Sequence, residues 1–418
     1  MRSVSYLLRQ IVTAALTANA IRPSRNPRLS IPTFAAGWLT TELAPHLLAL
    51  TATDTAVQTA RGKAGLAGKT LAAASVAGLG YTLYESTKVR NVVEDALVDG
   101  LGLDYVEQLD AAPTPAELAT PWRKLVNPFR MRDERVRVDR DIPFTQYGAR
   151  GHLDIYRGVD GPASGAPVLL QVHGGGWTIG RKDQQGIPLM QHLAAKGWVC
   201  VSINYRLAPR DAFPAQIIDV KSAIAWIKEH IAEYGGDPGY LAITGGSAGG
   251  HLSALAALTP NDPAYQPGFE DADTSIDVAV PHYGVYDFAG VTDLPEAKLL
   301  RDHFLSTRIV QRPYQDAREV YEAATPILRV TPDAPDFFVI HGRTDTLVPV
   351  GHARHFVAKL REESKRSVVY AELPGAQHAF DIFPSVRSAH VVRAVDRYLH
   401  WHWNTTRAAH RAEVSLGT

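Results

Sequence analysis

Gly245-Gly246-Ser247-Ala248-Gly249 is the strongest indication of fold in this 418-residue chain. It places a serine in a G-x-S-x-G frame directly after the apolar, strand-like residues 240–244. This frame is typical of a sharp turn from a strand into a helix, which strains the serine backbone and exposes its hydroxyl group. Apolar residues at helical spacing follow the turn, at Leu252, Leu255, Ala256 and Leu258. The sequence therefore predicts a strand, a tight turn that presents Ser247 as a nucleophile, and a helix.

A second glycine-rich segment, His173-Gly174-Gly175-Gly176-Trp177, follows the strand-like residues 167–172. A tetrahedral oxyanion requires several backbone N–H donors, and glycine lets the chain approach a reacting carbonyl closely. The predicted donors are the amides of Gly175, Gly176 and Ala248. The alternative is an ordinary glycine-rich loop. We predict a structural role for His173, whose imidazole would tie this loop to nearby backbone.

The base and the acid of a serine hydrolase of this type follow the nucleophile in the order acid, histidine. Asp345 lies in the turn after the strand-like residues 337–341, and His378 lies in a loop after residues 368–373. Functional groups collect beyond the carboxyl ends of strands in open α/β sheets. We therefore expect His378 to take the Ser247 proton and Asp345 to fix the imidazole tautomer.

Three residues compete for these two roles. His341 is a rival base, but it precedes Asp345 and would break the expected order. Asp287 is a rival acid, after the strand-like residues 278–285, and Asp381 lies too close to His378 in sequence to orient it easily. The sequence favours Asp345 and His378 over these alternatives.

From residue 135 to 404 the chain resembles the α/β-hydrolase fold and, within it, the hormone-sensitive-lipase-like carboxylesterases of bacterial family IV. The resemblance rests on segments 173–177, 204–209 and 245–250, on Phe213-Pro214, and on the Asp345 and His378 loops. It implies a Ser247–Asp345–His378 triad and oxyanion donors at Gly175 and Gly176. Many members carry an acidic residue at the position of Gly246 and an asparagine at that of His251, which puts the substrate class in doubt. The whole chain is also similar to actinobacterial lipases and esterases with a long N-terminal extension.

Apolar runs that alternate with helical stripes predict a mostly parallel sheet with helices on both faces. One helical stripe between the strands contains Ile217, Val220, Ile224, Ile227 and Ile231. Eight strands are expected, over residues 136–138, 152–156, 167–172, 199–205, 240–244, 278–283, 337–341 and 368–373. A lid insertion is expected around residues 288–334, where an ordinary pair of connecting helices is the alternative, and a polar tail at 405–418.

The overall composition limits the classes of partner. Lys and Arg number 43, as do Asp and Glu, so no strong field attracts nucleic acid. A lone cysteine, Cys200, excludes an intramolecular disulfide. No Cys and His cluster has metal-ligand spacing and no phosphate-binding loop occurs, so no metal and no cofactor are implied.

Residues 1–130 are expected to form a helical extension that serves as a cap or contacts a membrane surface. The first 20 residues also resemble a signal peptide, but polar residues dilute the apolar run and favour a retained amphipathic helix. The uncharged residues 70–84 fall short of the roughly 20 that span a bilayer, so no transmembrane helix is expected. The expected location is the cytoplasm or the periphery of a membrane or cell envelope.

The leading functional hypothesis is a serine carboxylesterase or lipase that acts on a small-molecule or lipid ester with a hydrophobic acyl chain. Two alternatives keep the same triad: an arylformamidase-like amidase and an acyltransferase. A ligand-binding pseudoenzyme is disfavoured because Ser247, Asp345 and His378 are all present. Trp177 and Phe380 lie next to the catalytic loops and are expected either to line the substrate pocket or to pack internally.

Overall fold

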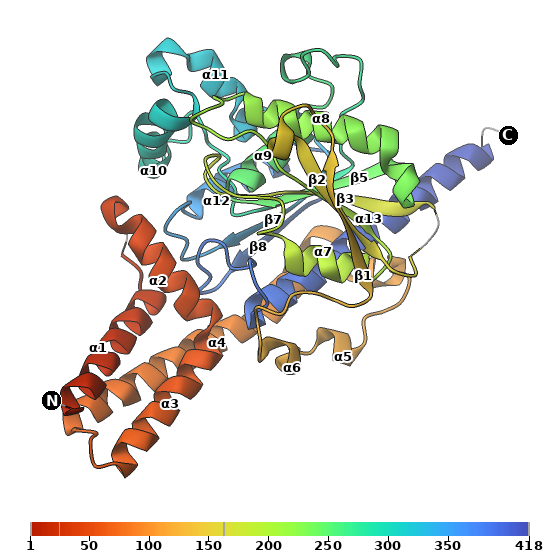
Figure 1. Cartoon of the computed structure of the whole chain (residues 1–418). Helices are drawn as coiled ribbons and strands as arrows, with labels where there is room; N and C mark the ends of the chain where they lie inside the picture. The colour runs from red at the N-terminus through yellow and green to blue at the C-terminus, as the bar shows by residue number, and fades with distance from the viewer. Residues whose placement is uncertain (1, 25, 162–163, 417–418) are drawn as a thin grey trace.

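A computed structural model describes residues 2–24, 26–161 and 164–416 of the chain. Its centre is an eight-stranded sheet in the order β1-β2-β4-β3-β5-β6-β7-β8 (Figure 1). The strands β1 and β2, and β2 and β4, pair antiparallel, whereas the pairs from β4 to β8 are parallel. The strands are β1 (Val136–Pro143), β2 (His152–Gly158), β3 (Ala166–Val172), β4 (Val199–Ile203), β5 (Gly236–Gly246), β6 (Val278–His282), β7 (Asp336–Gly342) and β8 (Val368–Leu373). All eight expected strands are present, and the predicted α/β-hydrolase fold is confirmed.

The sheet is buried on both faces because its central strands are apolar on both sides. In β5, Leu241 and Ile243 join one core and Tyr240 and Ala242 the other. The helices α8 (Ala215–His230), α9 (Ala248–Leu258) and α12 (Gly351–Glu363) contribute to the first core. The second core is formed by α7 (Ile187–Ala194), α13 (Val386–Leu416) and the C-terminal part of α4 (Leu66–Leu101). Because β3 to β8 run parallel, their carboxyl ends lie at one rim of this buried sheet.

The N-terminal region is helical, and part of it projects from the sheet as an arm (Figure 1). We define the arm as α1 (Arg2–Ile21), α2 (Ser30–Glu42), α3 (Ala44–Ala60) and residues 66–84 of α4. The rest of α4 packs on β8 and α13 through Val89, Val93 and Leu97. Two short helices follow, α5 (Pro115–Leu118) and α6 (Trp122–Leu125). In the described part of the chain, no helix is both long and apolar enough to cross a membrane.

A buried ion pair joins α2 to the body of the molecule, which comprises the sheet and the helices packed on it. Glu42, at the end of α2, pairs with Arg387 in the first turn of α13, and both side chains are almost fully buried. Ser385 Oγ also donates to Glu42 Oε2, at 2.6 Å. A buried charge is tolerated only when it is paired and hydrogen-bonded, so this contact fixes where α2 sits.

The predicted lid region lies between β6 and β7 and is largely helical. It contains α10 (Pro295–Leu299), a π-helix (Leu300–Ile309) and α11 (Arg318–Ala323). Short 3₁₀ turns complete the described structure, at Pro27–Leu29, Leu103–Gln108, Gly148–Gly151, Ile231–Tyr234, Pro263–Tyr265, Tyr314–Asp316 and Pro326–Leu328.

The polar tail predicted at residues 405–418 is helical where the structure describes it. Helix α13 continues through residue 405 without a break to Leu416. Trp403 packs on Tyr240 with ring centroids 4.6 Å apart, and the Arg407 guanidinium lies over the Trp403 ring. Trp403 thus packs the C-terminal part of α13 against β5.

Candidate active site

Ser247 occupies the turn between β5 and α9. Its φ of 59° and ψ of −120° lie outside the regions that non-glycine residues normally adopt. A side chain at Gly249 would place its Cβ 2.1 Å from the Val172 carbonyl oxygen, and one at Gly245 would lie 2.5 Å from the same atom. The turn can close only because both positions are glycine. Ser247 is half-buried among buried neighbours.

The His173–Trp177 loop leaves β3 beside this turn. A Cβ on Gly174 would lie 3.2 Å from Ser247 Cβ, so the two segments are in contact. The amide of Gly174 donates to Gln185 Oε1 at 2.7 Å. Within the described residues, the amides of Gly175 and Gly176 donate to no acceptor. Ala248 begins α9, where the first N–H groups of a helix have no intrahelical partner. These three amides are therefore available to a ligand oxygen.

His173 has the structural role predicted for it. Its Nδ1 lies 2.7 Å from the Gly174 carbonyl oxygen. Its ring stacks on the Tyr205 ring, with ring centroids 4.2 Å apart. Tyr205 Oη in turn donates to the His173 carbonyl oxygen at 2.9 Å. Burial lowers the pKa of His173 to about 4, so the imidazole is neutral at pH 7. A neutral, fully buried ring secures the glycine loop.

Asp345 and His378 meet beyond the ends of β7 and β8. His378 Nδ1 lies 2.6 Å from Asp345 Oδ2, and both side chains are buried. The other carboxylate oxygen accepts the backbone amides of Leu347 and Val348. Burial by itself favours the protonated acid, but the charge of His378 and hydrogen bonds from His341 and His378 hold the pKa of Asp345 well below its usual range. Asp345 is therefore a carboxylate that orients His378.

The rival residues are engaged elsewhere. His341 Nε2 lies 2.7 Å from the Val348 carbonyl oxygen and 3.4 Å from Asp345 Oδ2. It therefore approaches the same carboxylate oxygen that His378 Nδ1 contacts. The Asp287 carboxylate accepts the backbone amides of Val291 and Thr292. Asp381 accepts a hydrogen bond from His282 Nδ1 at 2.6 Å and another from Tyr283 Oη.

Comparison with known proteins identifies the family. The BD-FAE family profile matches residues 153–360. A Mycobacterium tuberculosis protein named "Probable carboxylic ester hydrolase LipM" is 46% identical over 415 residues, covering 96% of this chain and 93% of that relative. The chain belongs to the hormone-sensitive-lipase-like carboxylesterases of the α/β-hydrolase fold. Because the match with LipM spans nearly the whole chain, it includes the helical N-terminal region.

Further relatives agree with this family assignment. Esterase LipQ, also from Mycobacterium tuberculosis, is 42% identical over 81% of this chain and 80% of its own length. A solved structure of a truncated carbohydrate esterase from gut microbiota has a TM-score of 0.53 and 22% identity, over 65% of this chain and 99% of that chain. Propionate-bound Est2 esterase of Thermogutta terrifontis has a TM-score of 0.52 and 22% identity, over 65% of this chain and 94% of that chain. The two structures share the fold.

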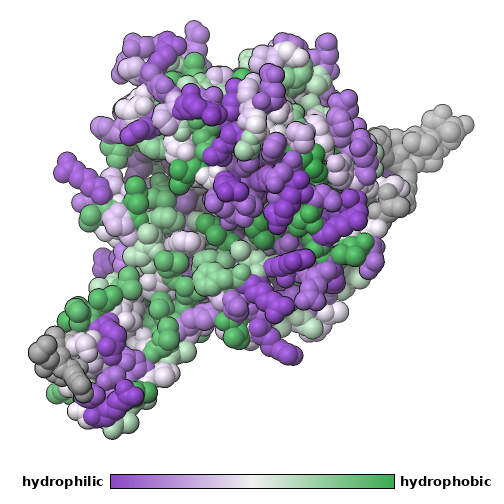
Figure 2. All heavy atoms as spheres, in the orientation of Figure 1, coloured by the Kyte–Doolittle hydropathy of each residue, from purple (hydrophilic) through white to green (hydrophobic). Residues whose placement is uncertain are grey.

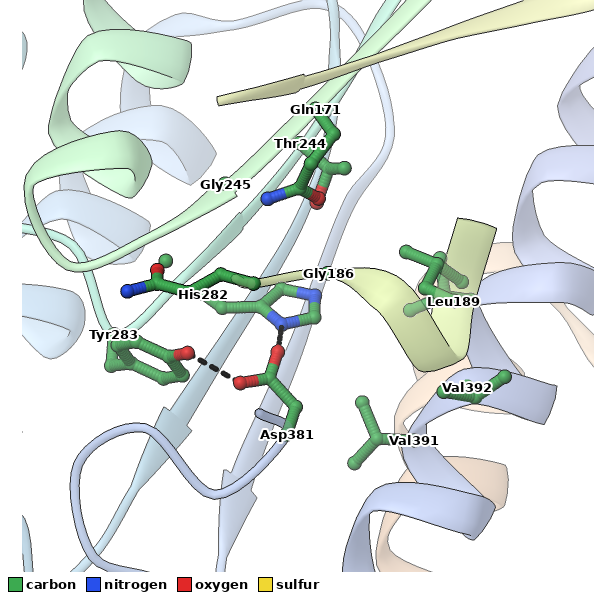
Figure 3. A pocket seen from close by; sticks show the side chains of 13 residues that line it. Gln171, Gly186, Leu189, Thr244, Gly245, His282, Tyr283, Asp381, Val391 and Val392 are labelled. Carbon is green, nitrogen blue, oxygen red and sulfur yellow. Dashed lines mark hydrogen bonds and ion pairs between the residues drawn. The ribbon is translucent and has the colours of Figure 1, made fainter. Parts of the chain in front are cut away.

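Tyr283 occupies the space that a side chain at position 246 would need in this carboxylesterase. Its phenol donates to Asp381 Oδ1, while Asp381 Oδ2 is bound to His282 (Figure 3). Burial and the Asp381 charge raise the pKa of Tyr283, so the phenol stays protonated. The centroids of the Tyr283 and His378 rings are also 4.6 Å apart. Gly246, where many family members have an acidic residue, thus makes room for a tyrosine that contacts the histidine loop.

A substitution tests this packing. In Gly246→Ala the new Cβ would lie 2.5 Å from Tyr283 Oη, so we expect a loss of about 1–3 kcal/mol in the free energy of unfolding from overpacking. Denaturant unfolding measures it. Gly80→Ala is the control, because Gly80 lies in helix α4 and a Cβ there meets nothing within 4 Å. Equal unfolding midpoints for Gly246→Ala and the wild type would contradict the close contact with Tyr283.

His251, the second departure from the family pattern, connects two segments. Trp177 Nε1 donates to His251 Nδ1 at 3.2 Å, and His251 Nε2 lies 2.7 Å from the Ala324 carbonyl oxygen in the lid region. Burial lowers the pKa of His251 to about 4, so it serves both contacts as a neutral imidazole. Trp177 is 2% exposed and packs on Phe288 as well. The indole therefore has an internal packing role.

Phe380, the other expected pocket residue, is fully buried and packs edge-on against Tyr283 at 5.2 Å. Trp177 and Phe380 are therefore both packed in the core beneath the glycine loop and the His378 loop. This agrees with the internal packing that the sequence offered as the alternative to pocket lining. Contact of either side chain with a substrate stays a prediction.

Two aromatic residues that the sequence does not single out lie at the site. Phe34, on α2, meets His378 edge-on with ring centroids 5.7 Å apart. A Cβ on Gly176 would lie 3.4 Å from Phe304, in the π-helix of the lid region. Gly37 of α2 also contacts Gln377, the neighbour of His378. No local pattern marks these residues, because each reaches the site from a distant segment.

Proposed function

We propose that the chain is a serine carboxylesterase that hydrolyses esters with a hydrophobic acyl chain. The observation that carries the proposal is the buried 2.6 Å contact between His378 Nδ1 and Asp345 Oδ2. Within the described residues, His378 Nε2 makes no hydrogen bond, so it remains available as a base. The relatives named carboxylic ester hydrolase and esterase support this reaction.

In the proposed reaction, Ser247 Oγ attacks the ester carbonyl carbon while His378 Nε2 takes the hydroxyl proton. The negative charge on the carbonyl oxygen is stabilised by the amides of Gly175, Gly176 and Ala248. The C–O bond then breaks, and His378 gives its proton to the leaving alcohol. Water repeats the sequence on the acyl-serine, releases the acid and restores Ser247. Asp345 stabilises the imidazolium in both halves.

The acyl class follows from the side chains around the triad. Phe34 lies against His378 and Phe304 beside Gly176, so aromatic rings from α2 and from the lid region flank the catalytic atoms. Such surroundings favour an apolar chain over a charged or sugar-like group because they offer few hydrogen-bond partners.

Hydrolysis of p-nitrophenyl esters from acetate to laurate tests the proposal. We expect turnover of these esters, with kcat/KM rising from acetate towards longer acyl chains, and labelling of Ser247 by a fluorophosphonate. N-formyl aryl amides assayed in parallel test the amidase alternative. Absence of both ester turnover and labelling, in a protein with a cooperative unfolding transition, would refute the proposed function.

A further inference from the structure

The arm has an interior that is unusually polar for a helical bundle. Residues buried between its helices include Gln10, Thr17, Thr51, Ser75 and Thr82, all 6% exposed or less. The Thr and Ser hydroxyls donate to the carbonyl oxygen four residues earlier in their own helix, so they are satisfied without water. A bundle that folds in water normally places apolar side chains at these positions.

Small residues bring α1 and α4 close together. A Cβ on Gly68 would lie 2.5 Å from the Tyr6 ring, and one on Gly78 would lie 2.5 Å from Thr17 Cγ2. These small residues let the two helix backbones approach closely and leave little room for large apolar side chains between them.

Tyr6 and Leu79 are buried in the arm, but many of its other large apolar side chains are on its outside. Leu8, Ile11 and Val12 form one exposed face of α1, at 59%, 47% and 50% exposure. Figure 2 shows hydrophobic residues in green along the arm and at its junction with the body. Other exposed apolar residues of the arm are Ile21, Ile31, Leu39, Leu50, Val57, Leu66, Tyr81 and Tyr84. Extended apolar exposure of this kind marks a binding surface.

The charge of the arm differs from that of the rest of the chain. Residues 1–70 contain eight Arg and Lys and only two acidic residues, although the whole chain has 43 of each. One of the two acids, Glu42, is buried with Arg387, and the other, Asp54, pairs with Arg9. Among the described residues, ion pairs are made by none of Arg22, Arg28, Arg61, Lys63 and Lys69. The balanced total charge thus hides a local basic excess.

We propose that the arm binds the surface of a lipid bilayer that contains anionic lipids. The apolar outer face would enter the headgroup and acyl boundary, and the basic residues would lie near the lipid phosphates. The polar interior remains enclosed between the helices, and the arm lies on one leaflet without crossing it. Tyr81 and Tyr84 suit this depth because their rings are apolar and their hydroxyls polar.

Membrane binding would also place the candidate active site close to lipid, because α2 belongs to the arm and contacts His378 through Phe34. This consequence rests on the proposed esterase function. The membrane contact itself does not, since it depends only on the outer face and charge of the arm.

Flotation of the full chain with vesicles tests the proposal. We expect binding to vesicles of phosphatidylcholine with phosphatidylglycerol at 3:1, and at least tenfold weaker binding to phosphatidylcholine alone or in 0.5 M NaCl. The variant Leu8→Gln/Ile11→Gln/Val12→Gln should bind the anionic vesicles at least tenfold more weakly. The variant Arg61→Gln/Lys63→Gln/Lys69→Gln should lose most of the preference for anionic lipid.

Matched controls come from the catalytic body. Val159, Val291 and Leu328 are 53%, 41% and 48% exposed, so their Gln variant makes the same chemical change away from the arm. Arg308→Gln/Lys365→Gln/Arg366→Gln is the charge control, on exposed residues. Both controls should bind like the wild type, and all variants should keep the wild-type thermal unfolding midpoint to within a few degrees.

Three results would overturn the proposal. The first is no binding of the wild type to either vesicle. The second is equal loss of binding in the arm variants and the body controls. The third is a concentration-dependent dimer, measured by light scattering, that the Leu8→Gln/Ile11→Gln/Val12→Gln variant abolishes while vesicle binding stays unchanged. That last result would assign the apolar face to a second copy of the chain. None of these readouts depends on ester turnover.

Discussion

Ser247→Ala is expected to lower kcat for ester hydrolysis by about 10⁶-fold, the scale seen when the nucleophile of a serine hydrolase is removed. The reason is that alanine cannot form the acyl intermediate, while the glycine-loop amides remain. The strained turn, with a φ of 59°, holds position 247 against the glycine loop, where a Cβ on Gly174 would lie 3.2 Å from Ser247 Cβ. KM should change little. Steady-state kinetics with the best p-nitrophenyl ester measures the effect.

The control for this prediction is Ser253→Ala. Ser253 lies two turns along α9 and is fully buried, so the variant removes a hydroxyl from the same helix without reaching the site. We expect kcat within about twofold of the wild type. A Ser247→Ala enzyme with at least a tenth of the wild-type kcat would show that another residue is the nucleophile.

Asp345→Asn is expected to lower kcat by about 10⁴-fold with the fold intact. The carboxylate accepts from His378 Nδ1 at 2.6 Å and so keeps Nε2 free of a proton for Ser247. An asparagine amide can donate to Nδ1 instead, which favours the wrong tautomer and removes the charge that stabilises the imidazolium. The measurement is kcat across pH 5–9, together with the unfolding midpoint.

Asp381→Asn provides a stringent control for this second prediction. Asp381 is a half-buried carboxylate that also contacts a histidine, with Oδ2 2.6 Å from His282 Nδ1. It lies only three residues beyond His378. It does not touch His378, so its variant should lose less than tenfold in kcat. If Asp381→Asn lost as much activity as Asp345→Asn, the assignment of Asp345 as the orienting acid would fail.

Local sequence determined the framework of the site. A glycine on each side of Ser247 is required by the approach of Val172, and that requirement can be read from five consecutive residues. The six parallel strands β3 to β8 were predictable because buried parallel strands are short, continuous apolar runs between turn residues. Asp345 and His378 were found by their order and by the loops after two such strands, which the fold brings to one rim.

Tertiary structure alone decided what surrounds that framework. Phe34 reaches His378 from α2 across more than 340 positions of the chain, and Glu42 meets Arg387 over a similar separation. Tyr283 fills the space left by Gly246, and His251 links the glycine loop to the lid region. Trp403 likewise packs α13 against Tyr240 across 163 positions of the chain. Turn geometry and strand patterning are properties of neighbouring residues, so the sequence carries them directly. Packing between distant segments depends on where the whole chain places them, and therefore no local pattern records it.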